Sequence, residues 1–203
     1  GDVSSNGWEV MRVDKNPETG YKAALYKGTA DSGFKGEYIY STQGTNPTSV
    51  KDWKNNFQQI ATGNSPQYSK SVENATILAS NKDYADVSFT GHSLGGGLAS
   101  ANALATDGKA VIFNAAGLSN PTKSSLDLNG RTANISAYVV QGEIVSYLQG
   151  KIDIQGPENI TTLPASYVPK IPFTRIDDRI RTGQRIRNHM MNVVIDKFNA
   201  YKK

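Results

Sequence analysis

One short segment limits the fold of this chain more than any other: a serine between two glycines, with a strand pattern before it and a helix pattern after it. The segment Gly91–Gly95 reads Gly-His-Ser-Leu-Gly. Asp86–Thr90 holds the β-branched and aromatic residues of a buried strand, and Leu94–Ala105 is rich in Leu and Ala, as helices are. Side chains at the glycine positions would collide with the neighbouring strand or helix. We therefore predict a strained turn that lifts the Ser93 hydroxyl out of the sheet as a nucleophile.

Length and composition limit the number of domains and the kinds of site that the chain can have. With 203 residues the chain is long enough to bury a continuous core, and we expect one domain over residues 1–203. It starts at Gly1 without Met, so we expect it to be excised or processed from a longer protein. The lack of cysteine excludes disulfides, thiolate metal sites and a cysteine nucleophile. No apolar stretch approaches the length of a transmembrane segment.

Strand and helix patterns alternate along the chain after an N-terminal β-hairpin. This alternation predicts an α/β fold with a mostly parallel central sheet and helices on both faces. Gly117–Asn134 is expected to run over the surface, and Pro157–Pro172 is expected to lack regular structure because it contains four prolines. The predicted strands are Trp8–Val13, Tyr21–Tyr26, Glu37–Thr42, Asp86–Thr90, Ala110–Asn114 and Ile135–Gln141, and the predicted helices are Val50–Ile60, Pro66–Asn81, Leu94–Ala105 and Gln184–Tyr201.

A serine nucleophile needs a general base, and the chain contains only two histidines. His92 adjoins Ser93 on the tight turn, where adjacent side chains diverge, so it does not readily reach the hydroxyl. We expect His92 to pack beneath the turn. His189, near the start of the last predicted helix, is therefore the predicted base.

The base in turn needs an acid. The Gly-x-Ser-x-Gly turn is typical of α/β-hydrolases, in which the acid follows a later strand and precedes the histidine in the sequence. Glu143 is the one acidic residue that directly follows a convincing strand, Ile135–Gln141. We therefore predict Glu143 as the acid. Asp153, Asp177 and Asp178 remain alternatives.

The oxyanion of the tetrahedral intermediate needs two hydrogen-bond donors. The backbone N–H of Leu94, at the start of the helix, is the first predicted donor. The second is expected from the loop after Glu37–Thr42, where Thr45 offers both its N–H and its hydroxyl. This chemistry requires no metal ion and no cofactor, and the sequence contains neither Cys clusters nor paired histidines that would bind a metal.

Three blocks of the sequence carry a family resemblance. Gly91–Gly96 resembles the serine turn of the class 3 lipases, an α/β-hydrolase family of fungal triacylglycerol lipases and related bacterial phospholipases. Tyr38–Thr45 is similar to the oxyanion strand and loop of that family, and Tyr138–Ser146 to its acid-bearing strand end. This chain departs from the family pattern at Gln43, where Arg is usual, and at Glu143, where Asp is commoner.

The resemblance implies an α/β-hydrolase fold and hydrolysis of carboxylic esters of lipids through an acyl-enzyme. The small size, the absence of cysteine and the start at Gly1 also resemble phospholipase toxin domains of secreted bacterial effectors. That likeness implies a soluble domain that is secreted or delivered as part of a larger bacterial protein, with an inhibitory or delivery protein as partner.

The charge of the chain bears on its substrate. The formal net charge is +4, and basic residues are concentrated near the C-terminus, which suits either an anionic membrane surface or an ordinary solvated face. On this basis we expect an A-type phospholipase rather than a triacylglycerol lipase. No aromatic residues interleave with the basic ones, which argues against nucleic-acid binding. The alternatives are an inactive hydrolase-fold binding module and a serine hydrolase acting on peptides or thioesters.

Overall fold

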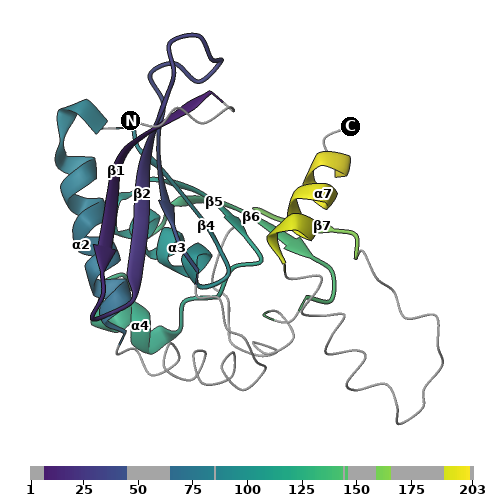
Figure 1. Ribbon diagram of the computed structural model, residues 1–203. Coiled ribbons are helices and arrows are strands. Elements are labelled where there is room, and N and C mark those ends of the chain that lie inside the picture. The colour runs from purple at the N-terminus through teal and green to yellow at the C-terminus, as the bar shows by residue number, and fades with distance from the viewer. Residues whose placement is uncertain are drawn as a thin grey trace.

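The computed structural model describes residues 7–44, 65–84, 86–143, 145, 159–165 and 190–201. Its strands form one seven-stranded sheet whose spatial order follows the chain (Figure 1). The first three strands pair antiparallel, and the later pairings, from β3–β4 to β6–β7, are parallel. This mostly parallel sheet confirms the predicted α/β class. The strands are β1 (Trp8–Asn16), β2 (Tyr21–Gly28), β3 (Tyr38–Thr42), β4 (Ser88–His92), β5 (Lys109–Phe113), β6 (Asn134–Val140) and β7 (Asn159–Leu163).

Strands β1 and β2 form the predicted N-terminal hairpin. Beside its turn, Asn16 pairs with Tyr21. The Asn16 side-chain oxygen accepts hydrogen bonds from the backbone N–H groups of Glu18 and Thr19, at 3.0 and 3.1 Å. Asparagine closes turns in this way because its short side chain satisfies backbone donors that have no strand partner.

Two long helices, α2 (Pro66–Ser80) and α3 (Leu94–Thr106), cover one face of the sheet (Figure 1). Helix α3 packs across β3 to β6 and against α2. Every residue from Leu94 to Leu104 is buried. Helices that are buried on all sides are largely apolar, and α3 consists mainly of Gly, Ala and Leu. The core on this face includes Leu25, Phe89, Leu98, Ile112 and Ile135.

Helix α7 (Met191–Tyr201) covers part of the opposite face. Ala137 of β6 belongs to the core beneath α3, and Val140, an odd number of positions later, points the other way. Val140 forms a separate buried cluster with Leu163 of β7 and Val194 of α7. Helices therefore lie on both faces, as predicted.

One prediction about local structure was wrong, and one short helix was not predicted. The proline-rich segment Pro157–Pro172 contains strand β7, which pairs with β6 between the prolines rather than at them. The segment Gly117–Asn134 contains a short helix, α4 (Asn120–Ser125). Its start is favoured by a proline in the first turn and by Ser119, whose hydroxyl accepts a hydrogen bond from the N–H of Thr122.

Other differences concern element bounds. Strand β4 ends at His92, two residues beyond the predicted Asp86–Thr90, and a single 3₁₀ turn, η1 (Lys82–Tyr84), precedes it. The predicted helix Val50–Ile60 lies outside the described residues, and of the predicted helix Gln184–Tyr201 the structure describes the part that forms α7. Among the described helices, none has an apolar run of the length that a membrane crossing needs.

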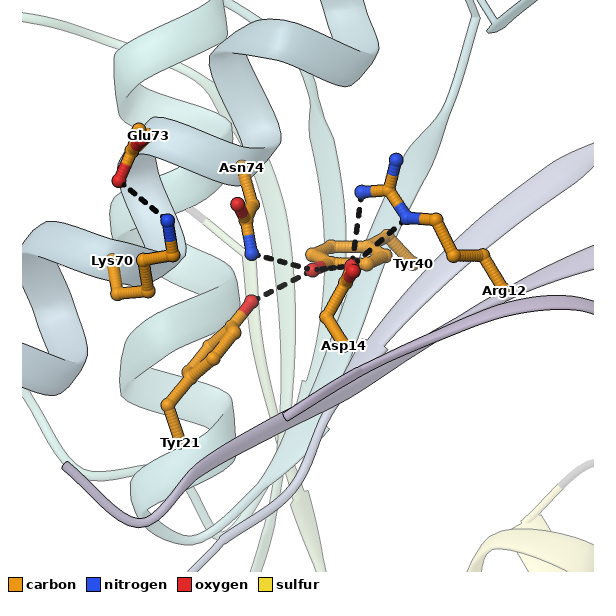
Figure 2. Close-up of polar contacts among 7 residues, drawn as sticks. All are labelled: Arg12, Asp14, Tyr21, Tyr40, Lys70, Glu73 and Asn74. Carbon is orange, nitrogen blue, oxygen red and sulfur yellow. Dashed lines mark hydrogen bonds and ion pairs between the residues drawn. The ribbon is translucent and has the colours of Figure 1, made fainter. Parts of the chain in front are cut away.

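A buried tyrosine links the hairpin, β3 and α2 through polar contacts (Figure 2). The hydroxyl of Tyr40, on β3, donates to Asp14 Oδ2 at 2.6 Å and lies 2.8 Å from the hydroxyl of Tyr21, which therefore donates to it. Arg12 contacts the same carboxylate at 2.9 Å, and Asn74 of α2 donates to the Tyr40 hydroxyl at 3.4 Å. Burial and the hydrogen bond to Asp14 raise the pKa of Tyr40, so its hydroxyl remains a proton donor.

A second buried tyrosine has no such contacts. Tyr68, on α2, lies against Gly97 of α3 and is 1% exposed. In the part of the chain that the structure describes, its hydroxyl has no hydrogen-bond partner. Burial also raises the pKa of Tyr68. Burial removes the water molecules that would hydrogen-bond to this hydroxyl, and no group among the described residues replaces them.

We predict that Tyr40→Phe lowers the free energy of unfolding by about 1–3 kcal/mol, because both Asp14 and Tyr21 lose a buried partner. Urea denaturation followed by circular dichroism measures this change.

The matched control is Tyr68→Phe, which removes the same atom from a hydroxyl without a partner among the described residues. This variant is expected to be at least as stable as the parent. If Tyr40→Phe were as stable as Tyr68→Phe, the polar contacts of Tyr40 would contribute nothing to stability.

Candidate active site

The predicted strand, turn and helix around Ser93 are present. Strand β4 ends at His92 and helix α3 begins at Leu94, with Ser93 between them at φ 59° and ψ −127°. A side chain is seldom found in this left-handed region, which marks Ser93 as strained. The Ser93 N–H donates to the Phe113 carbonyl at 3.1 Å, and the Ser93 carbonyl accepts from the N–H of Ala116 at 2.9 Å. The end of β5 and the loop after it thus hold both the N–H and the carbonyl of Ser93.

Glycines permit this turn because backbone passes directly over their Cα atoms. A Cβ at Gly91 would touch the backbone of Gly95, one turn further along. A Cβ at Gly95 would lie 2.7 Å from the Gly44 nitrogen, and one at Gly96 would lie 2.5 Å from the Ala115 Cβ. Contacts this short do not occur with real Cβ atoms, so these positions exclude larger residues.

The loop after β3 runs directly beside the serine turn. A Cβ at Gly44 would lie 2.5 Å from the His92 carbonyl oxygen and 3.4 Å from the Ser93 Cβ. On its other side the loop is tied to β2, because the Gln43 N–H donates to the Lys22 carbonyl at 2.9 Å. The predicted donor Thr45 is the next residue after Gly44 and lies outside the described residues. The other predicted donor, Leu94, is the first residue of α3, where backbone N–H groups have no acceptor within the helix.

The predicted acid, Glu143, lies three residues after the end of β6. Gly142 before it has φ 73°, the left-handed conformation that the turn requires. The Glu143 side chain is fully buried, and its Oε2 accepts a hydrogen bond from the Val145 N–H at 2.7 Å. A buried carboxylate is tolerated only with such partners. The predicted base His189 and the alternative acids Asp153, Asp177 and Asp178 lie outside the described residues.

Parallel pairing gathers these positions at one edge of the sheet. His92, at the end of β4, pairs with Phe113 at the end of β5, and Phe113 pairs with Tyr138 of β6. Ser93 and Glu143 therefore follow strands whose carboxyl ends lie at the same edge, separated by β5. This is the edge at which α/β sheets bind their ligands.

Asn114 is a site residue that the sequence analysis missed. It follows β5 with φ 41°, is 1% exposed, and its N–H donates to the Tyr138 carbonyl at 2.9 Å. Its side-chain oxygen accepts from the Val140 N–H at 2.8 Å. Asn114 therefore fixes the end of β6, three residues before Glu143. The signal in the sequence was a polar residue at the end of an apolar strand.

The arrangement suits acyl transfer. It offers a hydroxyl on a strained turn, a helix start whose N–H groups face outward along the axis, and a buried carboxylate two strands away. Within the described residues, no three His, Asp or Glu side chains come together as metal ligands do.

Comparisons with known proteins agree with this chemistry. A family model described as phospholipase-like, Tle-like phospholipase domain, matches residues 8–173. An extracellular phospholipase A1 of Serratia liquefaciens is 34% identical over 120 residues, which cover 59% of this chain and 34% of that protein. The chain thus spans about a third of the length of this relative.

Solved structures share the fold. A triacylglycerol lipase from Penicillium expansum aligns with a TM-score of 0.50 and 14% identity over 79% of this chain and 70% of its own. A lipase from Rhizopus microsporus var. chinensis aligns with a TM-score of 0.50 and 13% identity over 80% of this chain and 63% of its own. At this identity the likeness concerns the fold alone, which is the predicted α/β-hydrolase fold.

We predict that Gly95→Ala lowers the free energy of unfolding by about 1–3 kcal/mol, since the added methyl group would overlap the backbone of Thr42 and Gly44. Gly33→Ala is the matched control, because a Cβ there meets nothing within 4 Å. The control is expected to stay within about 0.5 kcal/mol of the parent. Equal stability of the two variants in chemical denaturation would contradict the close packing of the loop on α3.

Proposed function

The chain belongs to the phospholipase-like family of Tle-like phospholipase domains, and on that premise we propose that it hydrolyses carboxylic ester bonds of lipids with Ser93 as nucleophile. Membership confirms the resemblance to lipases and bacterial phospholipases that the sequence shows. The observation that carries the proposal is the strained Ser93 turn with the backbone of Gly44 packed against it. Such a turn places a hydroxyl beside the loop that supplies oxyanion donors in this fold.

In the proposed mechanism, Ser93 Oγ attacks the ester carbonyl carbon while His189 takes the hydroxyl proton. The tetrahedral intermediate collapses as the bond to the leaving alcohol breaks, and His189 returns the proton to that alcohol. Water, activated by His189, then attacks the acyl-enzyme and releases the fatty acid and free Ser93.

Glu143 is proposed to orient His189 and to stabilise its charged form. Its burial supports this role, because a carboxylate shielded from water interacts more strongly with an imidazolium. The packing of α7 on β6 supports it too, through the cluster of Val140 and Val194. In the sequence, Glu143 is three residues after Val140 and His189 is five residues before Val194.

The oxyanion is proposed to be held by the N–H of Leu94 and by Thr45. The position of Leu94 supports the first assignment, because it begins α3 directly after Ser93. The contact of Gly44 with the serine turn supports the second, since Thr45 is the next residue in the chain. Removing one such donor in serine hydrolases slows turnover by roughly 10²–10³-fold.

We propose phospholipid at a membrane surface as the substrate, cleaved by an A-type activity. The family description and the phospholipase A1 relative from Serratia support this choice over triacylglycerol. The net charge of +4 suits an anionic surface. Because the relative is an extracellular protein, we also propose that this chain acts after secretion or delivery.

Ser93→Ala and His189→Ala are each predicted to lower kcat for p-nitrophenyl esters on the order of 10⁴-fold or more, since a triad acts as a unit. Release of p-nitrophenol measures this. Labelling by a fluorophosphonate probe, which reacts with activated serines, should occur in the parent and be absent in Ser93→Ala.

A parent protein that binds phospholipid vesicles but neither hydrolyses esters nor reacts with the probe would overturn the proposal in favour of an inactive binding module. Full activity of either variant would overturn the residue assignment. Liposome hydrolysis analysed by mass spectrometry then identifies the ester bond that is cleaved.

Glu143→Gln is predicted to lower kcat by roughly 10²–10⁴-fold, because an uncharged amide neither holds the imidazole tautomer nor stabilises its charge. Asp153→Asn, at an alternative acid position, is expected to leave kcat unchanged. The reverse pattern in the same ester assay would move the role of the acid to Asp153.

A further inference from the structure

We propose that Thr42 is a positioning residue for catalysis, whose hydroxyl holds the first turn of α3, which carries the proposed oxyanion donor Leu94, in place against the end of β3. The proposal rests on the proposed function, since it concerns the same oxyanion site. It arises from a contact between β3 and α3 that no part of the triad uses.

Thr42 is the last residue of β3 and is 3% exposed. Its hydroxyl donates to the Gly95 carbonyl at 2.6 Å, and the Thr90 carbonyl of β4 is a second acceptor at 3.1 Å. Gly95 lies in the first turn of α3, two residues after Ser93. The Thr42 side chain therefore connects the end of β3 to the first turn of α3, which begins directly after Ser93.

The surroundings leave little freedom for this connection to shift. A Cβ at Gly95 would touch the Thr42 carbonyl oxygen and lie 2.9 Å from the Gln43 carbonyl carbon, so strand end and helix already meet backbone to backbone. The Gln43 N–H is tied to the Lys22 carbonyl on the far side. Two positions before Thr42, on the same face of β3, Tyr40 is held by the contacts in Figure 2.

One of the proposed oxyanion donors belongs to the helix start that Thr42 contacts. Leu94 is the first residue of α3 and directly precedes Gly95, whose carbonyl accepts from the Thr42 hydroxyl. The position of the Leu94 N–H thus depends on how the first turn of α3 sits against β3. Oxyanion donors act only at about 2.7–3.1 Å from the developing charge, and a displacement of about 1 Å can cost two orders of magnitude in rate.

A change at Thr42 should consequently act on turnover and not on binding of the ground state. Thr42→Val keeps the shape of the side chain but removes the donor to Gly95. Thr42→Ser keeps the donor. The matched control is Thr106→Val, which removes a hydroxyl that donates to the Asn102 carbonyl at 2.8 Å near the other end of the same helix.

The experiment measures kcat and KM for a soluble p-nitrophenyl ester and the rate of Ser93 labelling by a fluorophosphonate, whose phosphoryl oxygen needs the same donors. We expect Thr42→Val to lower both kcat and the labelling rate on the order of 10-fold with KM unchanged. Thr42→Ser and Thr106→Val should stay within about twofold of the parent, because both keep the hydroxyl donor to the Gly95 carbonyl.

Concentrations of active enzyme come from titration with the same probe, so partial unfolding does not imitate a lower kcat. Thr42→Ala, which also lacks the donor, serves if Thr42→Val does not fold. A parental kcat per titrated site in Thr42→Val or Thr42→Ala overturns the role of Thr42 and leaves the proposed function standing. A parent that neither hydrolyses the ester nor reacts with the probe overturns both.

Discussion

The structure depends on a close approach of backbone to backbone, where the end of β3 meets the first turn of α3. Glycines at 44 and 95 make it possible, because neither position has room for a Cβ. The approach lets the loop after β3 run beside Ser93, and the strained conformation of Ser93 is tolerated because strand, loop and helix hold its backbone on all sides. The proposed nucleophile Ser93 and the proposed donor Leu94 lie directly beside this contact.

The parallel register extends this arrangement across the sheet. It places the ends of β4, β5 and β6 side by side, so that Ser93 and Glu143, some fifty positions apart in the sequence, follow strands with only β5 between them. Asn114, after β5, and Thr42, at the end of β3, each hold backbone near Ser93 through a side-chain hydrogen bond. One fixes the end of β6 before Glu143, and the other ties β3 to α3. Their side chains act on backbone, which suits residues that set geometry rather than react.

The local pattern was sufficient to predict most elements. The serine turn, the hairpin and the strands of the parallel core follow from residue types with strong preferences, such as the glycines around Ser93 and the β-branched residues of β6. Strand β7 was missed because prolines lie on both sides of this short run, and prolines argue against regular structure. Its strand conformation depends on pairing with β6, which the local sequence does not reveal. Helix α4 was missed because its start signal, Ser119 with a following proline, stood in an otherwise polar segment.

The sequence by itself determined which groups are available for catalysis: a serine on a glycine-flanked turn, two histidines and a few candidate acids. These depend only on residue type and order. Tertiary structure alone decided the neighbourhood of that serine. No local preference of Thr42 or Gly44 predicts contact with α3, fifty residues later, since such contacts arise from strand pairing and the burial of a helix on a sheet. The burial of Glu143 is of the same kind, because a carboxylate at a strand end is solvated unless the fold covers it.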